Sequence, residues 1–431
     1  MLATDDYDPR TLGFCGSIDA MPPGRLTTSI PPQTADAERA AWRFLVLMAV
    51  VAMLGDVSYE GARSISGRYL SLLGASATVV ALTAGLGELA GSGLRVLTGW
   101  LADRTRACWP LTILGYSTNL LAIPTLALCD AWQAAAVLVV LERIGKAIRS
   151  PSRAVLLSHA ADRLGPGKTF GLDELLDQIG AVAGPLLLAG AMWLRAGEPD
   201  LARYRLAFVV TLVPVLLNVA LALFARSRFP SPQDFAPKVA PSDPVHAKRA
   251  LRVYLVAVAL LGAAFVDWAL VAVHVGRSGL LDEAWVPTLY AIAMGLDGAA
   301  ALVFGHAYDR RGVRVLSVAC LALALSSILV FATSGLVPML AGVALWAVAL
   351  GGLESIAKAA IATLVPRSER GAAYGRFYGV LGVAWWLGSF ALGLAYDVAP
   401  WWCGAITAAL ALAAAIVLFR VEAPATERPA T

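Results

Sequence analysis

The segment from Leu141 to Arg153, LERIGKAIRSPSR, places five ionisable side chains inside a stretch that is otherwise apolar enough to cross a membrane. Four of them recur every three or four residues and share one stripe on a helix: Glu142, Lys146, Arg149 and Arg153. A charge at the centre of a bilayer costs from about 2.5 to more than 10 kcal/mol. The stripe therefore predicts a water-filled cavity or partner charges beside it. The alternative for Arg149 and Arg153 is that they reach the lipid headgroups.

Acidic residues inside other apolar stretches supply charges that could face this stripe. A carboxylate in an apolar cavity holds its proton more firmly, and a nearby cation or substrate releases it, which links proton movement to substrate binding. Asp56, Glu88 and Asp297 are the first-choice proton sites. The alternative for each is a permanent salt bridge, such as Glu88 with Arg95 or Asp56 with Lys146. The complete set of proton-coupling candidates is Asp56, Glu60, Glu88, Asp177, Asp267, Asp297 and Glu354.

Basic and aromatic residues in the same spans are candidates for holding a substrate. Aromatic rings offer stacking surfaces to an apolar or cationic molecule, and buried charges of both signs suit a charged or zwitterionic one. Core packing is the competing explanation for any single tryptophan. The candidates for the substrate cavity are Tyr59, Arg143, Lys146, Arg149, Trp268, Trp346, Lys358, Tyr378 and Trp385.

An acidic face on the fifth span has the same spacing as the basic stripe. It consists of Asp173 and Asp177 followed by Gly180 and Gly184. The two glycines permit close backbone approach, so this face is predicted to lie against the basic stripe of the fourth span. For Asp177, a structural ion pair and a protonation site are both consistent with the pattern.

Composition indicates an integral membrane protein. Of the 431 residues, 58% are hydrophobic and 15% are charged, and the mean hydropathy is +0.70, whereas soluble domains carry about 25% charged residues. The net charge of +4 does not indicate nucleic acid binding, because Lys and Arg in membrane proteins mark the cytoplasmic side. The five cysteines stand far apart, and no disulfide framework, metal site or cofactor is predicted.

Hydropathy predicts an all-α polytopic membrane protein with twelve transmembrane helices in two pseudo-symmetric six-helix halves. The halves are residues 41–226 and 251–421, with a cytoplasmic linker at 227–250, a disordered cytoplasmic tail at 1–40 and a second tail at 422–431. Lys and Arg gather on the side of both termini, which places that side in the cytoplasm. The predicted spans are 42–62, 76–98, 109–129, 132–158, 170–194, 205–225, 251–274, 285–305, 314–333, 336–364, 371–396 and 400–420.

The two halves repeat one another at corresponding span ends. Gly99 to Arg106 reads GWLADRTR after the second span, and Gly305 to Arg314 reads GHAYDRRGVR after the eighth. The fifth and eleventh spans also align, with Gly184 over Gly388. Repeated halves with a binding site at their interface are the construction of secondary transporters.

These motifs resemble the major facilitator superfamily, and the resemblance covers nearly the whole chain after residue 40. The superfamily pattern after the second span is matched by Gly99, Leu101, Ala102, Asp103 and Arg104. The resemblance implies a latch that holds the cytoplasmic side shut, in which Asp103 meets the helix starting near Arg370 and either Arg149 or Arg153 of the fourth span. Simple anchoring of the cytoplasmic side is the alternative for the arginines. The latch candidates are Gly99, Asp103, Arg104, Arg153, Gly305, Asp309 and Arg310.

The motifs DVSYE, at Asp56 to Glu60, and RIGKAIRSPSR look more narrowly like a subgroup of bacterial facilitators whose substrates are mostly unassigned. That subgroup usually has His-Arg in the fifth span, where this chain has Asp173-Glu174. A coupling scheme is therefore not transferred from the subgroup to this chain.

The sequence favours a proton-coupled secondary transporter that exports a small organic solute across the bacterial cytoplasmic (inner) membrane. A monomer is expected, with the substrate, protons and the lipid bilayer as partners and no nucleic acid. Proton-coupled uptake of a charged metabolite and a non-transporting membrane sensor are the alternatives. An enzyme is disfavoured, because HExxH and GxSxG motifs are absent. Primary transport driven by ATP is also disfavoured, because Gly167-Lys168-Thr169 lacks the glycine that begins a phosphate loop.

Overall fold

The computed structural model describes residues 32–105, 107–164, 166–231, 248–364 and 370–421. Side chains of some helix-end residues within these ranges also lie outside the description, among them those at positions 99, 103, 104, 309 and 358. All regular elements in these ranges are helices. Their bounds are α1 (Pro32–Leu72), α2 (Ala77–Thr105), α3 (Cys108–Thr125), η1 (Leu126–Leu128), α4 (Trp132–Leu164), α5 (Pro166–Leu194), α6 (Asp200–Val210), α7 (Leu212–Arg228), α8 (Lys248–Ala264), α9 (Trp268–Ser278), α10 (Trp285–Arg311), η3 (Gly312–Val315), α11 (Leu316–Phe331), α12 (Leu336–Leu364), α13 (Arg370–Val398) and α14 (Trp401–Phe419).

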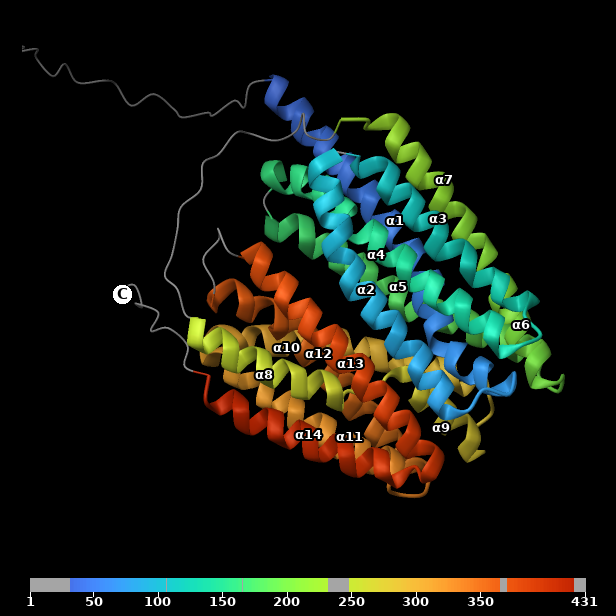
Figure 1. Ribbon diagram of the computed structural model, residues 1–431. Helices are drawn as coiled ribbons and strands as arrows, with labels where there is room; N and C mark the ends of the chain where they lie inside the picture. The colour runs from blue at the N-terminus through green and yellow to red at the C-terminus, as the bar shows by residue number, and fades with distance from the viewer. Residues whose placement is uncertain (1–31, 106, 165, 232–247, 365–369, 422–431) are drawn as a thin grey trace, which may run out of the picture.

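These helices make two halves of six membrane crossings each. Eleven stretches of the described residues are long and apolar enough to cross a membrane. The remaining crossing is α4, whose 33 residues are long enough but carry too many charges to count as apolar. The first half contains α1 to α7 and the second α8 to α14, as Figure 1 shows in blue to green and in yellow to red. The predicted all-α architecture of two six-helix halves is confirmed.

Helix α1 differs most from its predicted bounds. It begins at Pro32, inside the predicted tail, and continues to Leu72, whereas the predicted span is 42–62. The extension takes Arg63 and Arg68 into the membrane helix, where both form ion pairs. A paired arginine can lie in a spanning helix although it lowers the local hydropathy. The linker is also shorter than predicted, since α7 ends at Arg228 and α8 begins at Lys248.

The seventh crossing is broken, although the sequence predicts one helix over 251–274. Helix α8 ends at Ala264, and α9 begins at Trp268 with Asp267 as its N-cap. The Asp267 carboxylate accepts a hydrogen bond from the backbone N–H of Ala269 at 2.9 Å, and the indole N–H of Trp346 donates to the freed Val266 carbonyl at 2.8 Å. These side chains form hydrogen bonds with backbone groups that the helix break leaves unpaired and that lipid cannot hydrogen-bond.

Glycines set the tightest helix crossing in each half. In the first half, a Cβ atom on Gly184 of α5 would collide with the carbonyl oxygen of Val57 on α1. In the second half, a Cβ atom on Gly388 of α13 would collide with the carbonyl oxygen of Ala263 on α8. The sequence repeat aligns these two glycines, and they hold equivalent crossings. The predicted packing of the acidic face against α4 is therefore wrong for its glycines, which face α1 instead.

The main contacts between the two halves are those of α2 with α13, α5 with α10, and α1 with α9, and α1 also contacts α10 and α2 contacts α9. We call the end of the bundle where α7 ends and α8 begins the linker end, and the opposite end the far end. In Figure 1 the halves meet beside α9, at the far end, and the helix ends spread apart at the linker end.

Candidate functional site

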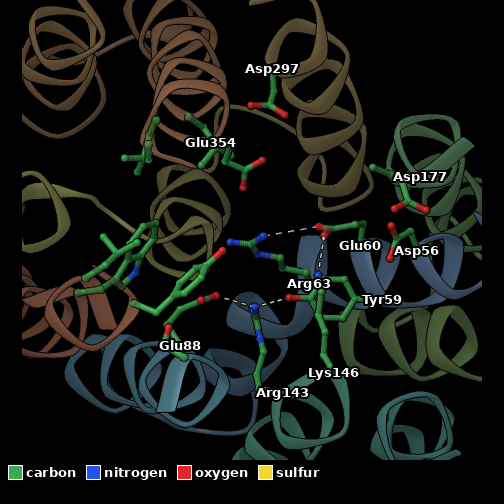
Figure 2. Close-up of a pocket in the computed structure, with 18 of the residues that line it drawn as sticks. Asp56, Tyr59, Glu60, Arg63, Glu88, Arg143, Lys146, Asp177, Asp297 and Glu354 are labelled. Atoms are coloured by element: carbon green, nitrogen blue, oxygen red, sulfur yellow. Dashed lines mark hydrogen bonds and ion pairs between the residues drawn. The ribbon is translucent and has the colours of Figure 1, made fainter. Parts of the chain in front are cut away.

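A charged cavity occupies the space between the two halves. Its volume is about 1380 Å³, open solvent at its mouth included, and its walls come from α1, α2, α4 and α5 of the first half and from α10, α12 and α13 of the second. Figure 2 shows basic side chains of the first half and acidic side chains of both halves pointing into it. The cavity is lined by eleven of the residues that the sequence singles out: Asp56, Tyr59, Glu60, Glu88, Arg143, Lys146, Asp177, Asp297, Glu354, Tyr378 and Trp385.

The basic wall of the cavity comes from α4. The Arg143 guanidinium lies 2.6 Å from the Glu88 carboxylate of α2 and donates to the Tyr59 hydroxyl of α1. The Lys146 ammonium lies 3.4 Å from the centre of the Tyr59 ring. Glu142 turns the other way, because its carboxylate accepts a hydrogen bond from Asn119 of α3 at 2.7 Å. The predicted stripe is therefore wrong at its first position, and the neighbouring Arg143 faces the cavity in its place.

Glu60 connects charges from several helices at mid-height. Its carboxylate lies 3.8 Å from the Lys146 ammonium and 3.7 Å from the Arg63 guanidinium. It also accepts a hydrogen bond of 2.5 Å from the Tyr290 hydroxyl of α10, in the other half. Arg63 in turn reaches Asp267 of the second half at 3.9 Å. Sequence reasoning missed Arg63 by ending the first span too early, although its spacing of three residues from Glu60 was a signal of pairing.

The remaining cations of the stripe pair with acids of the first half. Arg149 lies 3.6 Å from Asp56 and 4.5 Å from the centre of the Tyr116 ring. Arg153 donates to Asp173 of α5. Asp56 is thus paired with Arg149 and not with Lys146, the partner suggested by the sequence. Arg149 does not line the cavity, contrary to prediction.

Two predicted aromatic residues lie outside the cavity. Trp268 and Trp346 are almost completely buried and pack against one another at 5.5 Å between ring centroids. The Trp268 indole N–H donates to the Ser64 carbonyl of α1 at 2.9 Å. Neither tryptophan lines the cavity, nor does Asp267, because all three are used in packing around the break between α8 and α9. The prediction that Trp268 and Trp346 line the substrate cavity is therefore wrong, whereas the proton-coupling role of Asp267 stays a prediction.

Two carboxylates of the cavity combine a buried, unpartnered oxygen atom with the lack of a cationic partner among the described residues. They are Asp177 of α5 and Asp297 of α10, and each has a buried Oδ1 atom without a hydrogen-bond partner. Asp297 is only 5% exposed. Figure 2 shows both side chains directed into the cavity, with Asp56 beside Asp177. The cavity thus combines paired charges on α1, α2 and α4 with unpaired acids on α5 and α10.

The latch predicted at the linker end falls largely outside the described side chains. Those of Gly99, Asp103, Arg104 and Asp309 are not described, and neither is that of the cavity candidate Lys358. Arg310 is exposed, and a Cβ atom on Gly305 would meet open space. The latch stays a prediction.

Ion pairs close the far end between the two halves. Glu283, just before α10, accepts from Arg68 of α1 at 2.9 Å and from the Tyr204 hydroxyl of α6 at 2.8 Å. Asp282 accepts from Arg203 of α6 at 2.5 and 3.0 Å. The Arg203 hydrogen bond lowers the pKa of the Asp282 carboxyl. A lowered pKa means that this contact stabilises the closed far end at neutral pH and is lost as the pH falls through that pKa.

A helix cap forms a second far-end contact. Asp397, near the end of α13, accepts hydrogen bonds from the backbone N–H groups of Ala77 and Thr78 at 3.1 and 2.9 Å. It thereby caps the start of α2 in the other half. Charges and caps together hold the far end shut in this conformation, while the cavity extends towards the linker end.

The fold and the site define a class of protein: two repeated six-helix halves with a charged cavity at mid-membrane form a secondary transporter. The sequence matches the Major Facilitator Superfamily over residues 40–276 and 279–431. The chain belongs to that superfamily, and it is a transporter and not an enzyme.

Relatives and solved structures agree with this assignment. An uncharacterised protein of Mycobacterium tuberculosis is 38% identical over 396 residues, which cover 89% of this chain and 94% of the relative. The multidrug resistance protein MdtH of Aeromonas hydrophila is 31% identical over 151 residues, or 35% of this chain and 37% of MdtH. The crystal structure of the nucleoside transporter NupG shares the fold, with a TM-score of 0.67, 10% identity and coverage of 88% of this chain and 98% of that one.

Proposed function

We propose that this transporter exports a small charged organic solute in exchange for protons, as a monomer in the bacterial cytoplasmic membrane. Exposed arginines gather at the linker end, among them Arg226, Arg228 and Arg252. Basic residues mark the cytoplasmic side, so this conformation presents its cavity to the cytoplasm. The name of the partial relative MdtH is consistent with export.

The unpaired acids Asp177 and Asp297 carry the proposal. A buried carboxylate without a cation is expensive to keep ionised, so it either takes up a proton or binds a cationic group. A proton and a cationic solute then compete for the same oxygens. Competition of this kind produces exchange, because each half-cycle carries one of the two ligands across. Protons moving down their gradient into the cell would therefore drive the solute outwards.

Membrane vesicles with and without the protein test the proposed function. Vesicles are loaded with a cell metabolite extract, a pH gradient is imposed in either direction, and the solutes inside are identified by mass spectrometry. Proton exchange predicts a solute that gathers in the acidic compartment only when the protein is present, and that is lost when nigericin collapses the gradient. Accumulation in the alkaline compartment would show uptake by symport. Accumulation that is insensitive to the gradient would reject proton coupling.

Substitution of Glu283 by Gln should open the far end. The change removes the charge that Arg68 meets across the halves, and a hydrogen bond to a charged group contributes about 1.5 to 3 kcal/mol. The population with an open far end should rise by about tenfold or more. Spin labels at Glu198→Cys and Ser334→Cys, one in each half, would report it as a longer distance. Asp130→Asn is the matched control, because the Asp130–Arg205 pair lies within one half; an equal change in that variant would refute the role of Glu283.

A further inference from the structure

Six buried polar atoms of cavity-lining residues lack a hydrogen-bond partner among the described residues. Two are the Nε atoms of Arg63 and Arg143, whose guanidinium groups already form ion pairs through their other nitrogens. The other four belong to residues without an ion-pair partner in the described ranges: the donors are Nε of Arg95 and Nε1 of Trp385, and the acceptors are the Oδ1 atoms of Asp177 and Asp297. Trp385 is 7% exposed and Asp297 is 5% exposed. Each unmet buried group costs roughly 1 to 3 kcal/mol. Their number and their location in one cavity indicate the position of a ligand.

The donors and the acceptors among these last four atoms lie at different contacts between the halves. We call the α2–α13 contact and the α5–α10 contact the two seams. Arg95 is on α2 and Trp385 on α13, which pack together, whereas Asp177 is on α5 and Asp297 on α10, which also pack together. Donors therefore lie at one seam and acceptors at the other. Each seam takes one residue from each half.

Neighbouring charges do not neutralise these groups. The other cations of the cavity already have acidic partners: Arg143 has Glu88, and Lys146 and Arg63 share Glu60. Arg95 has no ion-pair partner among the described residues, and its guanidinium lies 5.9 Å from the centre of the Tyr378 ring. An unpaired cation therefore faces the α2–α13 seam and two unpaired acids face the α5–α10 seam.

We propose that the cavity binds a dipolar organic solute, with an anionic group at Arg95 and Trp385 and an ammonium group at Asp177 and Asp297. The inference rests on the proposed transport function and specifies its substrate class. A bound metal ion is the less suitable occupant of the acidic seam, because no group of three or more His, Cys, Asp or Glu residues in the described ranges is arranged to hold one. An ammonium group donates up to three hydrogen bonds and carries the charge that an unpaired carboxylate lacks.

A dipolar solute would act on both seams between the halves at once. Its anionic end would contact α2 and α13, and its cationic end would contact α5 and α10. A solute with one charge would satisfy one seam and leave the other with its unmet buried groups. Dipolar solutes should therefore bind more tightly than singly charged solutes of the same length.

Binding to the purified protein, without a membrane or a gradient, tests this inference. The probes are straight-chain ω-amino acids from aminobutanoate to aminooctanoate, each compared with its N-acetyl form, which is an anion, and its carboxamide, which is a cation. Thermal stabilisation measured over a range of concentrations gives the relative affinities. At one or more chain lengths the amino acid should bind about tenfold to a hundredfold more tightly than both derivatives, the range expected for hydrogen bonds to charged groups.

Variants identify which residues bind the carboxylate end of the probe and which bind its ammonium end. Arg95→Gln should remove the preference for the amino acid over its carboxamide, and Asp297→Asn should remove the preference over the N-acetyl form. Trp385→Phe, which keeps an aromatic ring and removes the unmet N–H, should reproduce part of the Arg95→Gln effect if that variant folds poorly. Trp386→Phe is the matched control, because its indole N–H also lacks a partner but Trp386 does not line the cavity.

Two results would overturn the inference. One is a carboxamide that binds as tightly as its amino acid and is unaffected by Arg95→Gln, which would identify a carrier of simple cations and leave proton exchange intact. The other is the absence of any preference at every chain length. If the wild-type protein prefers the amino acids in binding but shows no transport driven by the pH gradient, the proposed function is rejected and the inference about the substrate class stands.

Discussion

The Asp297→Asn protein is expected to lose gradient-driven accumulation of its solute while it continues to exchange solute for solute. Asparagine keeps the size and a hydrogen-bonding oxygen of Asp297 but cannot take up and release a proton. At a gradient of about one pH unit, one coupled proton supports about a tenfold accumulation. The variant should reach a ratio of about one. Vesicle uptake with and without the gradient measures the difference, using the solute identified from the metabolite extract.

The pH dependence of binding provides an independent check on Asp297. Protons and the cationic group compete, so the apparent affinity of the wild-type protein should fall as the pH is lowered. The Asp297→Asn variant should show a flatter profile. Asp130→Asn is the control, since this acid is exposed at the far end. If Asp297→Asn accumulates solute as the wild type does, Asp297 does not carry the proton.

Gly184→Val is expected to have the largest effect on folding. The added side chain would be forced into the carbonyl oxygen of Val57, and a backbone atom inside a packed helix cannot move aside as a side-chain tip can. Overpacking of this kind typically costs about 1 to 3 kcal/mol and at times more. Fluorescence-detected size-exclusion chromatography and thermal unfolding in detergent should show little folded protein.

Two further glycine variants separate close packing from helix propensity. Gly190→Val on the same helix introduces the same β-branched residue where a Cβ atom has nothing within 4 Å, and it should fold almost normally. Gly388→Val should be as harmful as Gly184→Val, because it closes the equivalent crossing with α8. Equal stability of the Gly184 and Gly190 variants would contradict this explanation.

The sequence predicted the helices well because membrane spans leave a strong hydropathy signal, and it predicted the repeat because both copies keep their glycines and acids. It was wrong about which residues of the α4 stripe face the cavity, although Lys146 and the separately predicted Arg143 do line it. A helix turns about 100° per residue, so the spacing of Lys146 and Arg149 fixes their angle to one another but not the direction in which the pair faces. Packing against α3 turned Glu142 away and brought Arg143 into the cavity.

The contacts that the structure describes between the halves were not predicted from the sequence. The hydrogen bond from Tyr290 to Glu60 and the cap of α2 by Asp397 join residues far apart in the chain. Their formation depends on the relative rotation of two bundles, which local periodicity does not encode. Arg95 was weighed only as a partner for Glu88, and only the cavity shows that it lacks one.

The charged face of α4 has a consequence for biogenesis. Arg143 and Lys146 would each cost roughly 2.5 to 3.5 kcal/mol if the translocon released this segment alone into lipid. Their acidic partners, Glu88 and Glu60, precede them in the chain, so the ribosome delivers the counter-ions first. We expect α4 to integrate only once α1 and α2 are already in the bilayer beside it, which makes the order of synthesis part of how this protein assembles.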